Sequence, residues 1–369
     1  MPLSPRPFVD QLAVYEPGRP LEEVARAFGF ADVSSLLKLA SNENLLGPSP
    51  RALDAMRASA AKMHLYPDGG CHYLRQDLAA RLDVDPGCLV FGAGSNEIIE
   101  FLGHVFLGPG TNLVMAAQAF LVYRLVAAAF EAEVVDVPMR DHAHDLDAMR
   151  RAITPATRLV FVANPNNPTG TMVAPAALNA FLDALPDHVL AVVDEAYIEL
   201  VDPALQPELV SRVRAGRNLI LLRTFSKAHG LAGLRIGYGI APARIVAWLE
   251  KFRQPFNVCA MAQEAALAAL ADGGHLRRTR ELVRDGLAFF EEGFRRLGLD
   301  FTPSTANFIL VRTGRGREVF QRMQQLGIIV RPVDAYGLPD HIRITTGTRA
   351  QNEACLRALE QVLRERGGA

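Results

Sequence analysis

The chain of 369 residues contains four lysines, and one of them lies where an amine could do covalent chemistry. Lys38 lies within an apolar run, and Lys62 and Lys251 lie on helical patterns. Lys227 instead ends the segment T-F-S-K (224–227), directly after a predicted strand. Burial or a neighbouring cation lowers the pKa of such an amine, which can then attack a carbonyl group. Lys227 is therefore the candidate for imine formation, and a solvated loop lysine is the alternative.

A carboxylate follows another apolar run of the sequence. Asp194 begins the segment D-E-A-Y (194–197). At the end of a buried strand a carboxylate loses its hydration and needs a cation or hydrogen-bond donors nearby. The protonated nitrogen of a pyridine ring would be a suitable cation, and a helix-capping acid is the alternative.

Two turn sequences follow further apolar runs. G-A-G-S-N-E (92–97) opens a predicted helix, where glycines and free backbone N–H groups can hold an anion. A dinucleotide fingerprint is one alternative, but Glu97 stands in place of its third glycine, and an ordinary strand-to-helix turn is another. N-P-N-N-P-T-G (164–170) consists of turn-forming residues that hold an asparagine side chain at a strand end.

These four clusters can form one site only if a sheet brings them together. Apolar runs rich in Val, Ile and Leu alternate with helical patterns between about residues 45 and 245, which predicts an α/β fold with a mostly parallel central sheet flanked by helices. Ligands of such sheets gather at the carboxyl ends of the strands. The expected strands are Cys88–Gly92, Asn112–Ala116, Glu133–Val137, Arg158–Ala163, Val189–Val193, Asn218–Arg223 and Arg235–Ile240, and the helices between them are Asn96–Phe106, Val122–Phe130, Leu146–Arg151 and Pro175–Leu185.

After residue 243 the pattern changes to longer helices and fewer strands, which predicts a smaller α+β domain. We expect an N-terminal segment at 1–44 that supplies an arm and part of the small domain, a large ligand-binding domain at 45–245, and a small C-terminal domain at 246–369. The expected elements are helices at Ile245–Arg253, Ala262–Ala271, Leu276–Leu297, Glu318–Leu326 and Arg349–Arg364, and strands at Phe308–Val311, Ile328–Arg331 and Ile342–Thr346.

Composition excludes several classes of protein. The 39 basic and 40 acidic residues nearly cancel, so no basic field attracts nucleic acid or an anionic membrane. The four cysteines form no C-x-x-C pair and no zinc spacing with histidines, so we expect neither a disulfide framework nor a metal site. Residues 1–10 do not form a signal peptide, and no apolar run is long enough to span a membrane, so a cytoplasmic location is expected.

Together the motifs resemble those of fold-type I pyridoxal-phosphate aminotransferases. In chain order they are Y-P-D (66–68), G-A-G-S-N-E (92–97), N-P-N-N-P-T-G (164–170), D-E-A-Y (194–197), T-F-S-K (224–227) and G-L-R-I-G-Y (233–238). K-L-A-S-N-E-N (38–44) and I-R-I-T-T-G-T (342–348) resemble histidinol-phosphate aminotransferases more narrowly. The similarity extends from about Tyr15 to the C terminus. Leu45, at the substrate mouth, and Cys259 depart from the family pattern.

The resemblance implies that pyridoxal phosphate is the cofactor, bound by the large domain, and that Lys227 holds it as a Schiff base. Asp194 would pair with the ring nitrogen, and Asn167 and Tyr197 would hydrogen-bond the ring's 3-oxygen. Lys227, Asp194 and Tyr197 are thus the expected catalytic residues, and Phe120 would stack on the ring. The groups expected around the cofactor phosphate are Ala93, Gly94, Ser95, Asn96, Ser226 and Arg235, with Tyr66 reaching in from the second subunit of a homodimer.

The resemblance also implies transamination between histidinol phosphate (or imidazole acetol phosphate) and glutamate or 2-oxoglutarate, a step of histidine biosynthesis. Arg343 and Arg331 would bind substrate anions, and Tyr15 and Asn42 would lie over the substrate. A surface arginine is the alternative for Arg331. Three other functions stay open: an aromatic or broad-specificity aminotransferase, a phosphothreonine decarboxylase of the same fold, and, from another class, a nicotinamide-dependent oxidoreductase.

Overall fold

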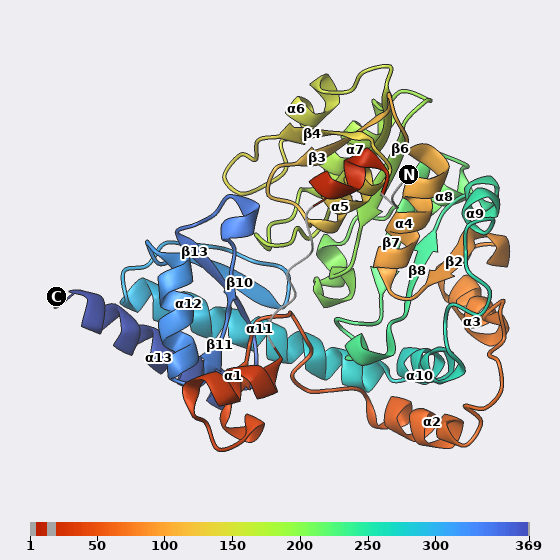
Figure 1. Cartoon of the computed structure of the whole chain (residues 1–369). Coiled ribbons are helices and arrows are strands. Elements are labelled where there is room, and N and C mark those ends of the chain that lie inside the picture. Colours follow the sequence, from red (N-terminus) through yellow and green to blue (C-terminus); the bar gives the residue numbers. More distant parts are fainter. Residues whose placement is uncertain (1–4, 13–19, 368–369) are drawn as a thin grey trace.

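A seven-stranded sheet forms the centre of the larger of two units in the computed structural model, which describes residues 5–12 and 20–367 (Figure 1). The strand order is β2-β8-β7-β6-β5-β3-β4, and β8 alone runs antiparallel to its neighbours. The mostly parallel sheet expected from the sequence is confirmed. The strands are β2 (Leu89–Gly92), β3 (Asn112–Ala116), β4 (Glu133–Val137), β5 (Thr157–Ala163), β6 (Leu190–Asp194), β7 (Leu219–Thr224) and β8 (Gly237–Ile240).

Burial along the strands explains their composition. Strands β2, β3, β6 and β8 are buried at every position, because helices cover both faces of the sheet. Of the seven strands, only β4, at one edge, includes exposed residues, Glu133 and Asp136. Its Asp136 pairs with Arg124 at 2.6 Å on the solvent side. A charged edge of this kind discourages pairing with the strands of other molecules.

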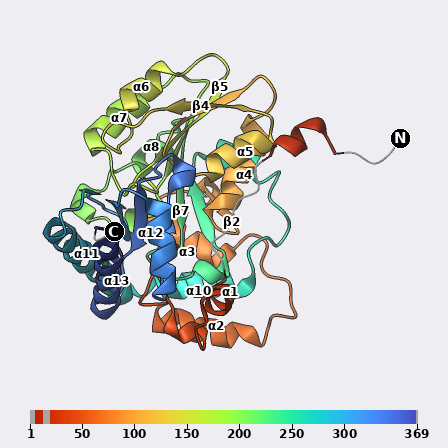
Figure 2. The ribbon, with the colours of Figure 1, turned by 60° about the vertical axis from the view of Figure 1, so that its left-hand side comes forward.

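Helices pack on the two faces of the sheet in separate layers (Figure 2). One face is covered by α4 (Ser95–Phe106), α5 (Val122–Ala129) and α9 (Ala243–Leu249). The other face is covered by α2 (Pro50–Ala60), α3 (His72–Leu82), α6 (Leu146–Arg151), α7 (Pro175–Asp183), α8 (Val210–Arg214) and α10 (Ala260–Leu270). Helix α9 extends past residue 245 and α10 follows it, so the core of this unit includes residues beyond the expected large domain. Where the units divide stays a prediction.

The smaller unit is built on a four-stranded antiparallel sheet in the order β12-β13-β10-β9. A separate parallel pair joins β1, near the N terminus, to β11. The strands of the smaller unit are β1 (Leu37–Lys38), β9 (Phe301–Thr302), β10 (Phe308–Arg312), β11 (Ile328–Ile329), β12 (Arg331–Pro332) and β13 (His341–Thr345). Its helices are α1 (Leu21–Phe28), α11 (Gly273–Arg296), α12 (Gly316–Gln325) and α13 (Arg349–Gly367). Helix α11 runs from the larger unit into this one (Figure 1).

Short 3-10 helices complete the described chain at Pro7–Gln11, Val33–Ser35, Pro86–Cys88, Ile198–Leu200, Pro203–Leu205, Ala232–Leu234 and Asp334–Tyr336. Two expected strands differ from the structure by more than one residue at an end. The run expected at Ile328–Arg331 is wrong as one strand, because β11 pairs with β1 whereas β12 pairs with β13. Strand β8 begins at Gly237 rather than Arg235, since Arg235 has a left-handed backbone (φ 51°) incompatible with a strand.

Candidate active site

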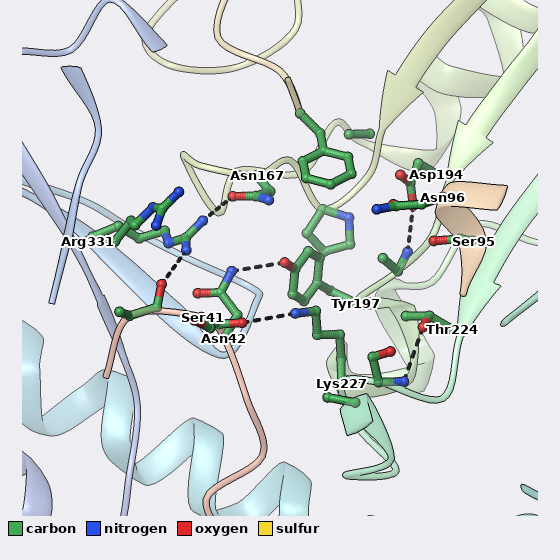
Figure 3. Close-up of a pocket in the computed structure, with 18 of the residues that line it drawn as sticks. Ser41, Asn42, Ser95, Asn96, Asn167, Asp194, Tyr197, Thr224, Lys227 and Arg331 are labelled. Carbon is green, nitrogen blue, oxygen red and sulfur yellow. Dashed lines mark hydrogen bonds between the residues drawn. The ribbon is translucent and has the colours of Figure 1, made fainter. Parts of the chain in front are cut away.

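A cavity of about 440 Å³ lies where strands β5, β6 and β7 of the larger unit end, facing the smaller unit. Strands β2, β3, β5, β6 and β7 all point to this edge, which is why residues far apart in the sequence meet there. In Figure 3, Asp194, Asn96 and Ser95 lie on one side of the cavity and Arg331 on the other, with Tyr197 and Lys227 between them. The expected site residues that line the cavity are Asn42, Ser95, Asn96, Phe120, Asn167, Asp194, Tyr197, Ser226, Lys227, Arg235, Arg331 and Arg343.

Lys227 follows β7 and extends its amine into the cavity. The amine nitrogen donates a hydrogen bond to the carbonyl oxygen of Ser41 at 3.1 Å and lies 5.8 Å from the ring centroid of Tyr197. Burial, with a further contribution from the nearby Arg343 guanidinium, lowers the pKa of Lys227 to about 8. More of the amine is therefore uncharged near neutral pH than in a solvated lysine, and attack on a carbonyl group requires the uncharged form.

A second lysine, missed by the sequence analysis, also lines the cavity. Lys38 lies on β1, and its amine forms an ion pair with Glu43 at 2.8 Å. The side chain of Lys38 is about one third exposed (33%). The amine of Lys227 has, within the described part of the chain, a hydrogen bond to a backbone carbonyl and no ion pair. The amine of Lys38 is already held by a carboxylate, whereas that of Lys227 is buried in the cavity, so Lys227 stays the better candidate for a nucleophile.

Asp194 ends β6 and is almost fully buried. Its Oδ2 accepts a hydrogen bond from the hydroxyl of Tyr123 at 2.6 Å, and its Oδ1 accepts one from the backbone N–H of Ala196 at 3.1 Å. Burial raises the pKa of Asp194, although both hydrogen bonds act in the opposite direction. The bond to Ala196 resembles that of a capping acid, but a buried carboxyl group that also faces a cavity is suited to a cationic ligand.

The turn before α4 forms a cradle for an anion. Gly94, the N-cap of the helix, has φ 82° and no side chain that could cap it, so the first backbone N–H groups of α4 can face a ligand. A Cβ atom at Gly94 would lie 2.5 Å from Nη2 of Arg235, so only glycine lets the guanidinium lie this close. Ser95, Thr224 and Ser226 line the same end of the cavity. This set of donors fits the phosphate of pyridoxal phosphate.

Arg235 and Glu97 hold this cradle in place. Arg235 donates to the carbonyl oxygens of Ala232 at 3.1 Å and Ala93 at 3.4 Å. Glu97 replaces the third glycine of a dinucleotide fingerprint, and its Oε2 accepts from the backbone N–H of Ala93 and from the amide of Asn257, both at 2.6 Å. The carboxylate thus ties the turn to the segment before α10, which a glycine could not do.

The middle of the cavity carries polar groups suited to the edge of an aromatic ring. The hydroxyl of Tyr197 accepts a hydrogen bond from the Asn42 amide at 2.9 Å. Burial raises the pKa of Tyr197 to about 12, so its hydroxyl keeps its proton and can donate it to a ligand oxygen. The side-chain oxygen of Asn167 accepts a hydrogen bond from Arg343. The NH2 group of the same amide therefore points away from Arg343 and can donate to another group.

Two arginines from the smaller unit lie side by side at the far end of the cavity. Arg331 on β12 and Arg343 on β13 are directly opposite each other in an antiparallel pair, so their side chains leave the same face of the sheet. Arg343 is buried and also donates to the carbonyl oxygen of Ala40 at 2.8 Å. Two guanidinium groups on one face of a sheet can bond the same anionic ligand. This arrangement favours a ligand site over a surface role for Arg331.

Several expected residues lie elsewhere. Tyr66 does not line the cavity of its own chain: it is 83% exposed, and its ring stacks on that of Phe256 at 4.8 Å. Tyr15 lies outside the described residues. Leu45 packs against the core of the smaller unit and does not line this cavity, and its effect on the substrate mouth stays a prediction. Cys259 is exposed at the start of α10.

The sequence analysis also missed Tyr336, which lines the cavity from a 3-10 turn between β12 and β13. No sequence signal marked it, because a lone tyrosine near Gly337 resembles an ordinary turn residue. Within residues 5–12 and 20–367, no group of His, Cys, Asp or Glu side chains is arranged to hold a metal ion. In the same ranges no helix is both long and apolar enough to cross a lipid bilayer.

Three comparisons relate the chain to known proteins. It matches the family model "Aminotransferase class I and II" over residues 34–359. It is 49% identical over 354 residues to the histidinol-phosphate aminotransferase of Akkermansia muciniphila (96% of this chain, 97% of that protein) and 48% identical over 351 residues to that of Moorella thermoacetica (95% and 90%). The crystal structure of histidinol-phosphate aminotransferase from Sinorhizobium meliloti in complex with pyridoxal-5'-phosphate is similar with a TM-score of 0.89 at 29% identity, covering 98% of this chain and 97% of that one.

Proposed function

The chain belongs to the class I and II aminotransferases, and on that premise we propose that it transfers an amino group between histidinol phosphate and 2-oxoglutarate with pyridoxal phosphate as its cofactor. The products would be imidazole acetol phosphate and glutamate, in a step of histidine biosynthesis. The observation that carries this proposal is the pair Arg331 and Arg343 at the opposite end of the cavity from the cradle at α4. One cavity thus offers two separate anion sites, with a nucleophilic amine between them.

Each end of the cavity has a distinct task in this reaction. The turn before α4, Ser226 and Arg235 would hold the cofactor phosphate, so that the cofactor stays bound while its covalent link to Lys227 is broken. When bound, pyridoxal phosphate supplies a carbonyl carbon that combines with amines and a protonated ring that takes up electrons from the neighbouring carbon. Asp194 would hold the proton on the ring nitrogen, and Tyr197 and Asn167 would fix the orientation of the ring by hydrogen bonds to its 3-oxygen.

Lys227 would then act twice. Its uncharged amine would hold the cofactor before the substrate binds, and its side chain would serve as a base beside the bound substrate. From this position it would remove the proton from the carbon that bears the amino group and return it on the other side of the exchanged nitrogen. Its lowered pKa of about 8 suits both steps, because the amine can give up and accept a proton near neutral pH.

Arg331 and Arg343 would select the two substrates. Histidinol phosphate has no carboxylate next to its amino group, so its phosphate would lie between the two guanidinium groups. The carboxylates of 2-oxoglutarate would use the same pair in the second half of the reaction. Asn42, held between Tyr197 and Thr345, would border the bound substrate. Tyr15 stays a predicted contact because it lies outside the described residues.

We also propose that two copies of the chain form the functional unit, with Tyr66 of each reaching the cofactor phosphate of the other. The support is that Tyr66 and Phe256 stack on each other while 83% and 46% exposed, which is unfavourable on a surface facing water. Light scattering should give the mass of a dimer, and Tyr66→Ala should weaken cofactor binding. A monomer with full activity would refute this assembly. We further propose that the reaction takes place in the cytoplasm.

Two other functions of the same family stay open. An aromatic or broad-specificity aminotransferase would need only one arginine for the carboxylate of its amino donor, and the second would serve only the other carboxylate of 2-oxoglutarate. A phosphothreonine decarboxylase would use both arginines but would release carbon dioxide. A nicotinamide-dependent oxidoreductase is disfavoured, because Glu97 fills the place of the fingerprint glycine and the chain matches an aminotransferase family.

A panel of amino donors separates these functions. The purified protein would be assayed with 2-oxoglutarate and, in turn, histidinol phosphate, phenylalanine, tyrosine and phosphothreonine, while glutamate and carbon dioxide are measured. We expect glutamate to form fastest from histidinol phosphate. Faster turnover of phenylalanine or tyrosine would refute the proposed substrate, and carbon dioxide from phosphothreonine without glutamate would refute transamination.

A further inference from the structure

Tyr123, on the first turn of α5, has a buried hydroxyl whose partner is the carboxylate of Asp194. Its hydroxyl oxygen lies 2.6 Å from Oδ2 of Asp194, and its side chain is fully buried. The ring stacks on Phe161, with centroids 4.3 Å apart, and meets the edge of Phe120 at 5.7 Å. These two ring contacts fix the hydroxyl in space independently of any ligand.

The surroundings of Asp194 make this hydrogen bond consequential. The ionisable groups that face the carboxylate are Tyr123 from α5, Glu195 and Tyr197 from the segment after β6, and Lys227 after β7. Glu195 disfavours a charge on Asp194, whereas Lys227 favours it only as the charged amine. The donors bonded directly to the carboxylate are the Tyr123 hydroxyl and the Ala196 N–H. Burial favours the neutral acid, so these two donors help to keep the group ionised.

We propose that Tyr123 is a positioning residue that keeps Asp194 ionised and oriented, so that the carboxylate, and not the acid, meets the ring nitrogen of the cofactor. The inference rests on the proposed function and extends it to a residue that touches neither reacting carbon nor nitrogen. Without the hydroxyl, the carboxylate becomes more basic and takes the proton from the ring nitrogen. One proton moves from nitrogen to oxygen, and a neutral pair replaces the ion pair.

The first test compares two ligands of the apoprotein. Tyr123→Phe keeps both ring contacts and removes only the hydroxyl. We expect it to weaken pyridoxal phosphate about tenfold, since hydrogen bonds to charged groups are among the stronger ones in proteins. It should not weaken the analogue in which a C–H group replaces the ring nitrogen, because that analogue offers no proton to Asp194. Equal losses of affinity for both ligands would show a merely structural role and overturn the proposal.

Tyr238 provides a matched control. It is also a buried tyrosine, its hydroxyl also meets a charged group, Arg223, and it packs in the core on the opposite face of the same sheet. Tyr238→Phe therefore removes a comparable hydrogen bond without touching Asp194. We expect it to leave the ratio of the two affinities unchanged. A changed ratio in this control would overturn the assignment of the effect to Tyr123.

A spectroscopic titration supplies a second readout. A positive ring nitrogen disfavours a second positive charge on the link to Lys227, so the pH midpoint of the bound cofactor's absorption change should rise in Tyr123→Phe. In an Asp194→Asn background the same substitution should have no further effect, because the two groups act through one bond. Placing 3-fluorotyrosine at position 123 should lower the midpoint, because its more acidic hydroxyl donates a stronger hydrogen bond to Asp194. An unchanged midpoint in both Tyr123→Phe and the 3-fluorotyrosine protein, or a further shift in the Asp194→Asn background, would overturn the inference. A wild-type protein that binds no pyridoxal phosphate would instead refute the proposed function.

Discussion

Removal of the Arg331 guanidinium should impair turnover of histidinol phosphate far more than turnover of phenylalanine. Arg331 lies opposite Arg343 on the antiparallel pair β12–β13, and both line the far end of the cavity. A phosphate dianion can bond to both groups, whereas the single carboxylate of phenylalanine needs only the buried Arg343. Arg331→Ala therefore removes a contact that only the phosphorylated substrate uses fully.

The size of the effect follows from the kind of bond that is lost. A hydrogen bond between charged groups contributes about 1.5–3 kcal/mol, which corresponds to a factor of about 10 to 150 in kcat/KM. Arg331 is only partly buried, and its removal relieves repulsion of Arg343, so we expect the lower half of this range. The loss for phenylalanine should stay below about threefold, since it reflects only small changes in cavity shape.

The assay is steady-state kcat/KM for the two donors with saturating 2-oxoglutarate. Arg312→Ala is the matched control, because Arg312 is an arginine of the same small sheet whose side chain is 56% exposed and does not line the cavity. It should leave both donors unaffected. Equal losses for both donors in Arg331→Ala would refute the reasoning that a phosphate lies between the two guanidinium groups.

Three further predictions test the cofactor end of the site. Lys227→Ala should abolish turnover and the violet to near-ultraviolet absorption of the bound cofactor, and turnover without an added amine would refute its role. Because burial lowers the pKa of Lys227 to about 8, capture of pyridoxal phosphate by the apoprotein should accelerate up to about pH 8 and level off above it, and a flat stopped-flow profile would contradict this. Gly94→Ala should weaken the cofactor more than tenfold by fluorescence titration, since the new Cβ would meet Arg235 at 2.5 Å. Gly216→Ala is the control, because Gly216 also has a positive φ (74°, against 82° for Gly94) but a Cβ there would meet no atom within 4 Å. Equal losses of cofactor affinity in the two variants would show that no clash with Arg235 is involved.

Much of the larger unit could be predicted from the sequence because its strands are buried on both faces. The expected bounds of β3, β4 and α6 agree with the structure residue for residue. Such strands read as continuous apolar runs, and turn residues mark their ends clearly. The smaller unit was harder, because Val330 joins two short strands of different sheets and looks from the sequence like the middle of one strand.

The positions of the main polar groups were also evident from the sequence. Lys227, Asp194 and the turn at Gly94 each follow a strand that points to the same edge, so the parallel order of the sheet brings them together. Contacts made across the two units were not evident. Lys38 seemed part of an apolar run, and Tyr336 resembled a turn residue, yet both line the cavity.

The sheet, the edge at which the site forms and the candidate amine could be predicted from the sequence alone, because they depend on local patterns of apolar and turn residues. The facing arginines, the ion pair of Lys38 with Glu43 and the hydrogen bond from Tyr123 to Asp194 became evident only in the folded chain. These pairings join residues brought together by chain folding, and their energies depend on burial. No pattern along the chain encodes how far a side chain is removed from water.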